Sequence, residues 1–232
     1  CVDYLIIGAG PAGVQTARFF DLSHTSYTLL EKNMVPGSFF ATLPRERGLI
    51  SINKVNPGDI CEEEKTRFDW NSLLEGIKFK HFSKEFFPSA NALVDYIAAY
   101  TEAHNIKINY GEEVTKISKD SKGFHAQSKN GNTFTGKRLI ICTGFTKETI
   151  PKVPGIELAE TYATYNSNRK SFDHKKVLII GTGNSGFEVA TSLLDNAGEV
   201  DLISPRPIRL ANNTHYVGDL RALNTKAVEN YQ

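Results

Sequence analysis

The sequence predicts an α/β fold in which two units are each built on a parallel β-sheet. The first observation is an order of apolar strand, glycine-rich turn and helix that begins at residue 3 and recurs from residue 176. The second is a set of short alternating segments between the two copies, which is typical of an antiparallel meander. Because a strand, a crossover helix and a further strand form the unit from which parallel sheets are assembled, the recurrence predicts two such sheets.

The first copy begins with the apolar run Asp3–Ile7, which has the length and composition of a buried parallel strand. The glycine-rich turn Gly8–Gly13 follows at once, and a helix is predicted from about Pro11 to Leu22. Ser26–Glu31 is the next predicted strand. Together these segments predict a βαβ unit at the start of the chain.

Residues 36–87 are predicted to be irregular and are rich in aromatic side chains. A helix is expected from about Ser89 to His104, directly after Pro88. One face of this helix carries three apolar side chains, those of Leu93, Ile97 and Tyr100. The run Lys107–Tyr110 is expected to add a further parallel strand.

Three short segments then alternate in polarity and predict the meander: Glu113–Ser118, Gly123–Ser128 and Thr133–Thr135. The pair Asn130-Gly131 is a strong signal for a tight hairpin turn. A separate apolar strand is expected over Lys137–Cys142, and it ends at Thr143-Gly144.

The second copy consists of the strand Lys176–Ile180, the turn Gly181–Gly186, a helix to about Asn196 and the strand Glu199–Ser204. The predicted domains are therefore residues 1–150 and residues 151–232. Each is expected to be the N-terminal portion of its domain, with the remainder beyond residue 232, so the fold is predicted to be incomplete at its C-terminal end.

Composition excludes several classes of protein. With 40% apolar and 23% charged residues and a net charge of +1, the chain offers no electrostatic reason to bind nucleic acid. The apolar runs are strand-sized, far shorter than the roughly 20 residues of a spanning helix, so no membrane span is predicted. The three cysteines form no C-x-x-C pair and the six histidines show no ligand spacing, so no metal site is predicted.

Gly8, Gly10 and Gly13 form a G-x-G-x-x-G pattern between a strand and a helix. In this pattern the first glycine permits the turn, the second lets a pyrophosphate approach the backbone, and the third lets helix and strand pack closely. Glu31 lies 18 residues after Gly13, near the spacing of about 20 expected for an acid that binds ribose hydroxyls. The first copy is therefore predicted to bind a dinucleotide.

Gly181, Gly183 and Gly186 repeat the pattern, and the same 18-residue step from Gly186 leads to Ser204 in place of an acid. Arg206 follows two residues later. A hydroxyl and a guanidinium suit the 2′-phosphate of NADPH, which a carboxylate would repel, so NADPH is favoured over NADH. The alternative is that Arg206 and the nearby Arg209 are solvated surface charges.

The chain has a glycine motif followed by an acid, then a meander, and then a second glycine motif. This order is typical of flavoproteins that bind two dinucleotides, with FAD at the first site. The candidate FAD-binding residues are Gly8, Gly10, Pro11, Ala12, Gly13, Glu31, Lys32, Ser38, Phe39, Val114, Thr143 and Gly144. The candidate NADP-binding residues are Gly181, Thr182, Gly183, Asn184, Ser185, Gly186, Ser204 and Arg206.

The tract Gly181–Glu188 resembles the G-x-G-N-S-G-x-[DE] motif of flavin-containing monooxygenases. Four further segments resemble more closely an endoplasmic-reticulum branch of FAD-dependent oxidoreductases related to them: Pro36–Phe40, Leu49–Lys54, Asp69–Leu74 and His215–Ala222. The identifying monooxygenase motif is altered, since its aromatic and histidine positions hold Val153 and Ala159. The flavin-side Gly-Gly-x-Trp is likewise replaced by Gly37-Ser38-Phe39-Phe40.

This resemblance implies an FAD- and NADPH-dependent oxidoreductase of monooxygenase type that acts in the degradation of proteins from the endoplasmic reticulum. It also implies location in the lumen of that organelle, with the cytoplasm as the alternative, and quality-control proteins as partners. Asn53 lies where the monooxygenases have an active-site asparagine, although an asparagine here could equally hold a loop. The alternative function is a flavin-bearing adaptor with little or no turnover. A thiol–disulfide reductase is disfavoured because no C-x-x-C pair is present.

Overall fold

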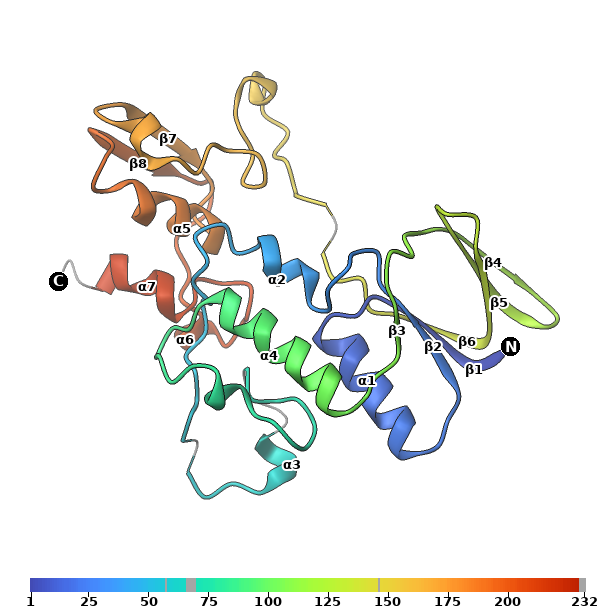
Figure 1. Ribbon diagram of the computed structural model, residues 1–232. Coiled ribbons are helices and arrows are strands. Elements are labelled where there is room, and N and C mark those ends of the chain that lie inside the picture. The colour runs from blue at the N-terminus through green and yellow to red at the C-terminus, as the bar shows by residue number, and fades with distance from the viewer. Residues whose placement is uncertain (57, 66–69, 146, 230–232) are drawn as a thin grey trace. The chain divides into compact units, whose positions relative to one another are not determined.

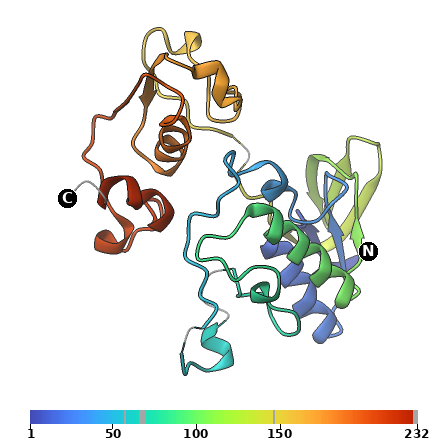
Figure 2. The ribbon, with the colours of Figure 1, turned by 60° about the vertical axis from the view of Figure 1, so that its left-hand side comes forward.

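The computed structural model describes residues 1–56, 58–65, 70–145 and 147–229, so Asp69 of the Asp69–Leu74 segment lies outside the described residues. The chain divides into two compact units (Figures 1 and 2). Unit 1 comprises Cys1–Thr42 and Asn53–Thr146, and unit 2 comprises Leu43–Ile52 and Lys147–Gln232. The division at residue 150 remains a prediction about domains, but the short segment 43–52 is grouped with the later residues, which the sequence did not indicate.

Unit 1 contains one six-stranded sheet in the order β3-β2-β1-β6-β5-β4. Its strands are β1 (Val2–Ile7), β2 (Tyr27–Leu30), β3 (Ile108–Asn109), β4 (Val114–Asp120), β5 (Gly123–Ser128) and β6 (Thr133–Ile141). The pairs of β1 with β2, β1 with β6 and β2 with β3 are parallel, while β4, β5 and β6 pair in antiparallel fashion. The predicted mixture of parallel sheet and meander is therefore confirmed, although both lie in one sheet.

The prediction of two separate strands, Thr133–Thr135 and Lys137–Cys142, is wrong, because residues of both segments belong to the single strand β6. One continuous strand pairs with β5 in its first half and with β1 in its second half. Gly136 lies at the change of partner, where it is paired with both Phe124 and Val2. A Cβ atom at Gly136 would lie 2.9 Å from the backbone nitrogen of Leu5, so the close approach of β1 to β6 depends on the missing side chain.

Two helices of unit 1 lie on the same side of its sheet in both views (Figures 1 and 2): α1 (Pro11–Leu22) and α4 (Ala90–Ala103). The hydroxyl of Ser89 caps α4 by accepting a hydrogen bond of 3.2 Å from the Ala92 amide. Leu93, Ile97 and Tyr100 are buried along one face of α4, as their spacing predicted. These helices connect consecutive parallel strands, and that leaves the carboxyl ends of β1 and β2 beside the start of α1.

In the described part of residues 36–87, three short helical turns interrupt an irregular path: α2 (Ser38–Thr42), α3 (Glu62–Lys65) and η1 (Phe79–His81). The aromatic side chains of this stretch pack in part on one another. Phe40 lies edge-on to both Phe39 and Trp70, with ring centroids 5.2 Å and 6.3 Å apart. These contacts support packing as the main role of the aromatic residues.

Unit 2 is built around a parallel pair of strands, β7 (Lys176–Ile180) and β8 (Glu199–Ile203), joined by α5 (Asn184–Leu193). Its other helical segments are η2 (Ile156–Leu158), η3 (Arg169–Phe172), α6 (Ala211–Thr214) and α7 (Ala222–Glu229). Helix α5 ends at Leu193, three residues before the predicted end. In the part of the chain that the structure describes, no helix has the length and apolar character needed to cross a membrane.

Candidate functional site

The turn that follows β1 requires glycine at its first position. Gly8 has a φ of +103°, in the region that side-chain-bearing residues rarely adopt. A Cβ atom at Gly8 would also lie 2.5 Å from the carbonyl oxygen of Cys142 and 3.3 Å from the amide nitrogen of Thr143. The first glycine thus lets Cys142 and Thr143, which follow β6, lie against the turn.

The third glycine allows α1 to pack against that same turn. A Cβ atom at Gly13 would lie 1.9 Å from the carbonyl oxygen of Gly8, so no larger residue fits without moving the helix. Gly13 is accordingly buried, together with Val14 and Ala17 on the same face of α1. The predicted role in close packing of helix and strand is confirmed by this contact.

The second glycine faces open space. Gly10 is the N-cap residue of α1, and no atom lies within 4 Å of a Cβ atom built on it. No side chain caps this helix, and Pro11 has no amide hydrogen, so the amides of Ala12 and Gly13 have no intrahelical acceptor. An uncapped helix start next to an empty position is the arrangement that binds a phosphate group.

The second motif repeats these three arrangements in unit 2. Gly181 has a φ of +125°, and a Cβ atom at Gly186 would lie 2.2 Å from the carbonyl oxygen of Gly181. Gly183 is the uncapped N-cap residue of α5, with nothing within 4 Å of its Cβ position. The N-cap dihedral angles are also alike, with φ −74° and ψ −178° at Gly10 and φ −86° and ψ −176° at Gly183. Both helix starts therefore form a cradle of the same shape.

The residues after β2 and β8 occupy equivalent positions. The amide of Gly8 donates to the carbonyl of Leu30 over 2.7 Å, and the amide of Gly181 donates to the carbonyl of Ile203 over 2.8 Å. Glu31 and Ser204 are the next residues along each strand. The shared 18-residue spacing in sequence thus corresponds to equivalent positions in the structure, which hold the acid Glu31 in unit 1 and the hydroxyl of Ser204 in unit 2.

The carboxylate of Glu31 is buried, with 4% of its surface exposed, and is held by three donors. Its Oε2 atom accepts from the amide of Ala9 over 2.9 Å. Its Oε1 atom accepts from the amide of Asn33 and from the hydroxyl of Ser38, each over 3.0 Å. These hydrogen bonds orient the carboxylate beside the glycine turn. In this arrangement Ser38, a predicted cofactor residue, contacts the acid.

The other candidate FAD residues surround this turn to different degrees. Gly144 continues the end of β6 after Thr143 and has a φ of +62°. Lys32 is exposed, and Phe39 is 40% exposed. Val114 instead packs against the core cluster of the sheet, so its side chain contributes to packing. Sequence reasoning thus identified the turn and the acid, while the surrounding candidates have mixed environments.

Asn53 is 5% exposed, and its side-chain amide is occupied by other parts of unit 1. Its Nδ2 atom donates to the carbonyls of Ser83 and Glu85 over 2.9 Å and 3.2 Å. Its Oδ1 atom accepts from Asn71 over 2.9 Å. These contacts support a role in holding the loop. A catalytic role stays a prediction, and it would require the amide to exchange these partners.

In unit 2 the side chain of Asn184 serves a purpose that sequence reasoning missed. Its Nδ2 atom donates to the carbonyl of Asp219 over 2.9 Å. Its Oδ1 atom accepts from the amide of Arg221 over 2.9 Å and from the side chain of Asn224 over 3.0 Å. The first residue of α5 therefore fixes the segment 219–224 beside the second glycine turn.

The remaining candidate residues of unit 2 are accessible. Ser185, Ser204 and Arg206 are exposed, and Thr182 is partly buried. The hydroxyl of Ser204 accepts a long hydrogen bond of 3.3 Å from the amide of Arg206, so the two predicted 2′-phosphate residues are adjacent.

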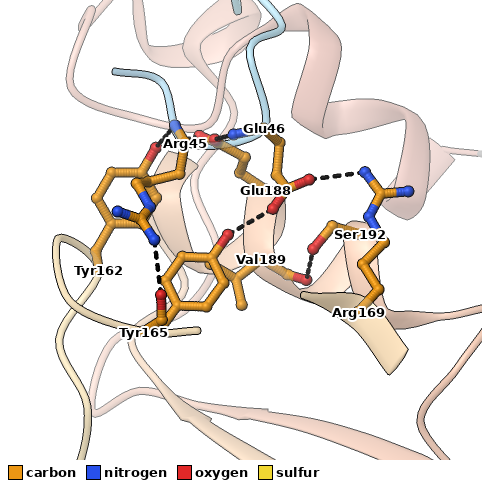
Figure 3. A network of polar contacts seen from close by, with 8 residues as sticks. All are labelled: Arg45, Glu46, Tyr162, Tyr165, Arg169, Glu188, Val189 and Ser192. Atoms are coloured by element: carbon orange, nitrogen blue, oxygen red, sulfur yellow. Dashed lines mark hydrogen bonds and ion pairs between the residues drawn. The ribbon is translucent and has the colours of Figure 1, made fainter. Parts of the chain in front are cut away.

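Glu188, the acid that ends the second motif, binds the segment 43–52 to unit 2 (Figure 3). Its Oε1 atom accepts from the amide of Glu46, and its Oε2 atom accepts from the hydroxyl of Tyr162, each over 2.7 Å. The oxygen of Tyr162 in turn accepts from the amide of Arg45 over 2.9 Å. Burial raises the pKa of the Glu188 carboxyl, and the hydrogen bonds from Glu46 and Tyr162 act against this increase.

Glu46 extends the network from the other side. Its carboxylate accepts from the hydroxyl of Tyr165 over 2.5 Å and pairs with Arg169 over 2.7 Å. The guanidinium of Arg45 donates to the carbonyls of Ala163 and Tyr165, and it lies 5.0 Å from the centroid of the Tyr165 ring. The family motif pointed to an acid at Glu188, but its partner Glu46 is 142 residues away in sequence and gave no local signal.

A family model described as pyridine nucleotide-disulphide oxidoreductase matches residues 5–232. The chain belongs to this family. The match includes both glycine turns and the segment 43–52. The three cysteines of this oxidoreductase family member are free, and none is adjacent to another in sequence.

Among curated relatives, FAD-dependent oxidoreductase domain-containing protein 2 from Danio rerio is 38% identical over 99% of the chain. The aligned part is 34% of that relative, so the chain spans about a third of its length. This similarity confirms the resemblance drawn from the four distinctive sequence segments.

Solved structures agree on the fold of this family member. The flavin-containing monooxygenase from Stenotrophomonas maltophilia matches with a TM-score of 0.72 at 21% identity, over 90% of this chain and 59% of that one. A complex of OTEMO with FAD and NADP matches with a TM-score of 0.65 at 18% identity, over 90% of this chain and 40% of that one. The predicted α/β architecture with two dinucleotide motifs is thereby confirmed, and its fold is of the Rossmann type.

Proposed function

We propose that the chain is the cofactor-binding part of an oxidoreductase that holds FAD in unit 1 and takes electrons from NADPH bound in unit 2. The observation that carries this proposal is the repeated arrangement at the two helix starts: Gly10 in unit 1 and Gly183 in unit 2 each lie at an uncapped helix start, and each has an open Cβ position. The name of the Danio rerio relative includes FAD dependence, and one solved neighbour binds FAD and NADP together.

The residues present fit both cofactors. In unit 1 the start of α1 would bind the pyrophosphate of FAD, and Glu31 would accept hydrogen bonds from its ribose hydroxyls. Ser38 and the Ala9 amide keep that carboxylate oriented. In unit 2 the start of α5 would bind the pyrophosphate of NADPH, with Ser204 and Arg206 close to its 2′-phosphate.

The cofactors supply the hydride chemistry, and the chain supplies binding and orientation. The choice of coenzyme follows from the difference between Glu31 and Ser204 at equivalent positions. A carboxylate at the second position would repel a 2′-phosphate, whereas the neutral hydroxyl and the adjacent guanidinium favour it. The relatives of monooxygenase type support an oxidoreductase of that type, with oxygen as an acceptor.

The second candidate function is a flavin-bearing adaptor in the quality control of proteins in the endoplasmic reticulum. It is favoured by the loss of the monooxygenase signature, since Val153 and Ala159 replace the aromatic and histidine residues of that motif. Location in the lumen of the endoplasmic reticulum belongs to this proposal and rests on the resemblance alone. Under the adaptor hypothesis FAD is bound but hardly turned over.

Stopped-flow reduction of the full-length protein separates the two functions. The flavin is mixed without oxygen against NADPH or NADH, and the reduced protein is then mixed with oxygen. Reduction by NADPH and reoxidation by oxygen are expected for the oxidoreductase. Failure of both coenzymes to reduce the flavin would favour the adaptor.

A further inference from the structure

The segment His215–Ala222 is distinctive in the sequence but received no chemical role, and the structure places its end at the second glycine turn. Asn184, the first residue of α5, binds the carbonyl of Asp219 and the amide of Arg221. The amide of Leu220 also donates to the carbonyl of Arg209, and the carbonyl of Leu220 accepts from Ala211. Arg221 is therefore held at a fixed point beside the start of α5.

The guanidinium of Arg221 has an unusual environment. The residue is partly buried, yet among the described residues its side chain has no hydrogen-bond acceptor and no ion-pair partner. Asp219, the nearest acid in sequence, instead accepts from the hydroxyl of Thr214 over 2.7 Å. A cation held without a partner next to a helix start is electrostatically unfavourable, because that end of the helix is itself positive.

A bound anion would reverse this unfavourable arrangement. The start of α5 has free amides and an open position at Gly183, and a dinucleotide brings a doubly charged pyrophosphate to that place. The planar guanidinium of arginine can donate two parallel hydrogen bonds to phosphate oxygens. The fold thus brings together a cradle of amides and a partly buried arginine.

We propose that Arg221 binds the pyrophosphate of the nicotinamide coenzyme, while Arg206 binds the 2′-phosphate. This inference rests on the proposed coenzyme site in unit 2. The two arginines then have different roles. Arg221 contributes affinity for NADP⁺ and NAD⁺ alike, and Arg206 contributes the preference for NADP⁺ over NAD⁺. The backbone amide that binds Asn184 is kept when the Arg221 side chain is replaced, so the substitution leaves the segment 219–224 in place.

The test measures ligand binding by isothermal titration calorimetry on the full-length protein with its flavin bound. The ligands are NADP⁺, NAD⁺ and adenosine 2′-monophosphate, which has the 2′-phosphate but no pyrophosphate. The variants are Arg221→Ala, Arg221→Lys and Arg206→Ala, with the exposed Arg209→Ala as control. Circular dichroism and the melting temperature establish that each variant is folded.

The two arginine variants are expected to weaken the binding of different sets of ligands. Arg221→Ala should weaken NADP⁺ and NAD⁺ about tenfold to hundredfold and leave adenosine 2′-monophosphate unchanged. Arg206→Ala should weaken NADP⁺ and adenosine 2′-monophosphate and leave NAD⁺ unchanged. Arg221→Lys should keep part of the affinity because it keeps the charge, and Arg209→Ala should match the wild type.

Unchanged binding of NADP⁺ by Arg221→Ala would overturn the inference while leaving the coenzyme site intact. An equal loss for adenosine 2′-monophosphate would also overturn it, because Arg221 would then act on the 2′-phosphate or on the fold. Wild-type protein that binds neither NADP⁺ nor adenosine 2′-monophosphate would instead refute the proposed coenzyme site itself.

Discussion

The amide of Ala9 donates a hydrogen bond of 2.9 Å to Oε2 of Glu31 and thereby joins the glycine turn directly to the acid that follows β2. The acid is buried and has two further donors, the amide of Asn33 and the hydroxyl of Ser38. It is therefore already oriented before any ligand binds. Preorganisation of this kind lowers the cost of binding a ribose.

Replacing Glu31 by glutamine should weaken FAD binding by about 1–3 kcal/mol, because a charged acceptor becomes neutral and part of it becomes a donor facing other donors. Equilibrium dialysis of flavin against the full-length apoprotein measures the dissociation constant. The matched control is Glu113→Gln, an exposed acid of the same unit that pairs with Lys129. An unchanged dissociation constant of FAD for Glu31→Gln would indicate that Glu31 contributes to the fold and not to FAD binding.

The preference for NADPH should depend on Arg206. Arg206→Ala is expected to slow flavin reduction by NADPH about tenfold to hundredfold at limiting coenzyme and to leave reduction by NADH nearly unchanged. Anaerobic stopped-flow measurements with both coenzymes check this. Equal slowing with NADPH and NADH would instead indicate that Arg206 supports the structure.

Tyr162→Phe should destabilise unit 2. The change removes the donor to Oε2 of Glu188 and the acceptor of the Arg45 amide, both in buried or half-buried surroundings. Losing one partner of a buried polar pair costs about 1–3 kcal/mol, and the free energy of unfolding in urea should fall by that amount. Tyr216→Phe is the control, since the Tyr216 side chain is 64% exposed. Equal stability of the two variants would contradict the structural role of Glu188.

His104 should make the protein less stable in mild acid. Burial lowers the pKa of this ring below its usual 6.5, and the nearby Arg18 cation lowers it further, while Glu75 and Asp21 act in the opposite direction. The folded state thus binds the proton less readily than the unfolded state. The protein therefore has its full stability at pH values above the pKa of His104 in the unfolded state, about 6.5. This stability declines as the pH falls towards the lower pKa of His104 in the folded state.

Urea unfolding between pH 8 and pH 5 measures this dependence. The slope below about pH 6.5 should diminish in His104→Gln, which cannot take up a proton, and should persist in the exposed control His174→Asn. A slope that is the same in His104→Gln as in the wild type would assign the acid sensitivity to other groups.

The glycine turns and the helices beside them could be predicted from sequence because their determinants are local. Three glycines, a preceding apolar run and a following helix suffice to define each cradle, and both strands end where the 18-residue step indicates. The ends of α4 were likewise predicted closely, since Ser89 caps the helix and His104 follows its last turn.

The remaining features depend on contacts between distant residues. The segment 43–52 is bound to unit 2 by Glu188, which is 142 residues away from Glu46 in sequence. Strand β6 continues through Gly136 because it changes partner there, and only the three-dimensional pairing reveals that change. The side chains of Ser38 and Asn184 contact protein groups that no spacing rule identifies.

The central claim, that unit 1 binds FAD and unit 2 binds a nicotinamide coenzyme, is tested most directly by the flavin absorbance of purified full-length variants. Gly13→Val is unsuitable, because its Cβ atom would clash with the backbone of Gly8 and disturb the fold. A Cβ atom at Gly10 meets no protein atom within 4 Å, so Gly10→Val would project into the open space where the proposed site would hold the pyrophosphate. Gly183→Val is the matched control in unit 2, where the Cβ position is equally open.

The account predicts that Gly10→Val is folded by circular dichroism but carries no flavin, whereas Gly183→Val keeps its flavin and loses NADP⁺ binding. Undiminished flavin absorbance in Gly10→Val would contradict the FAD site in unit 1.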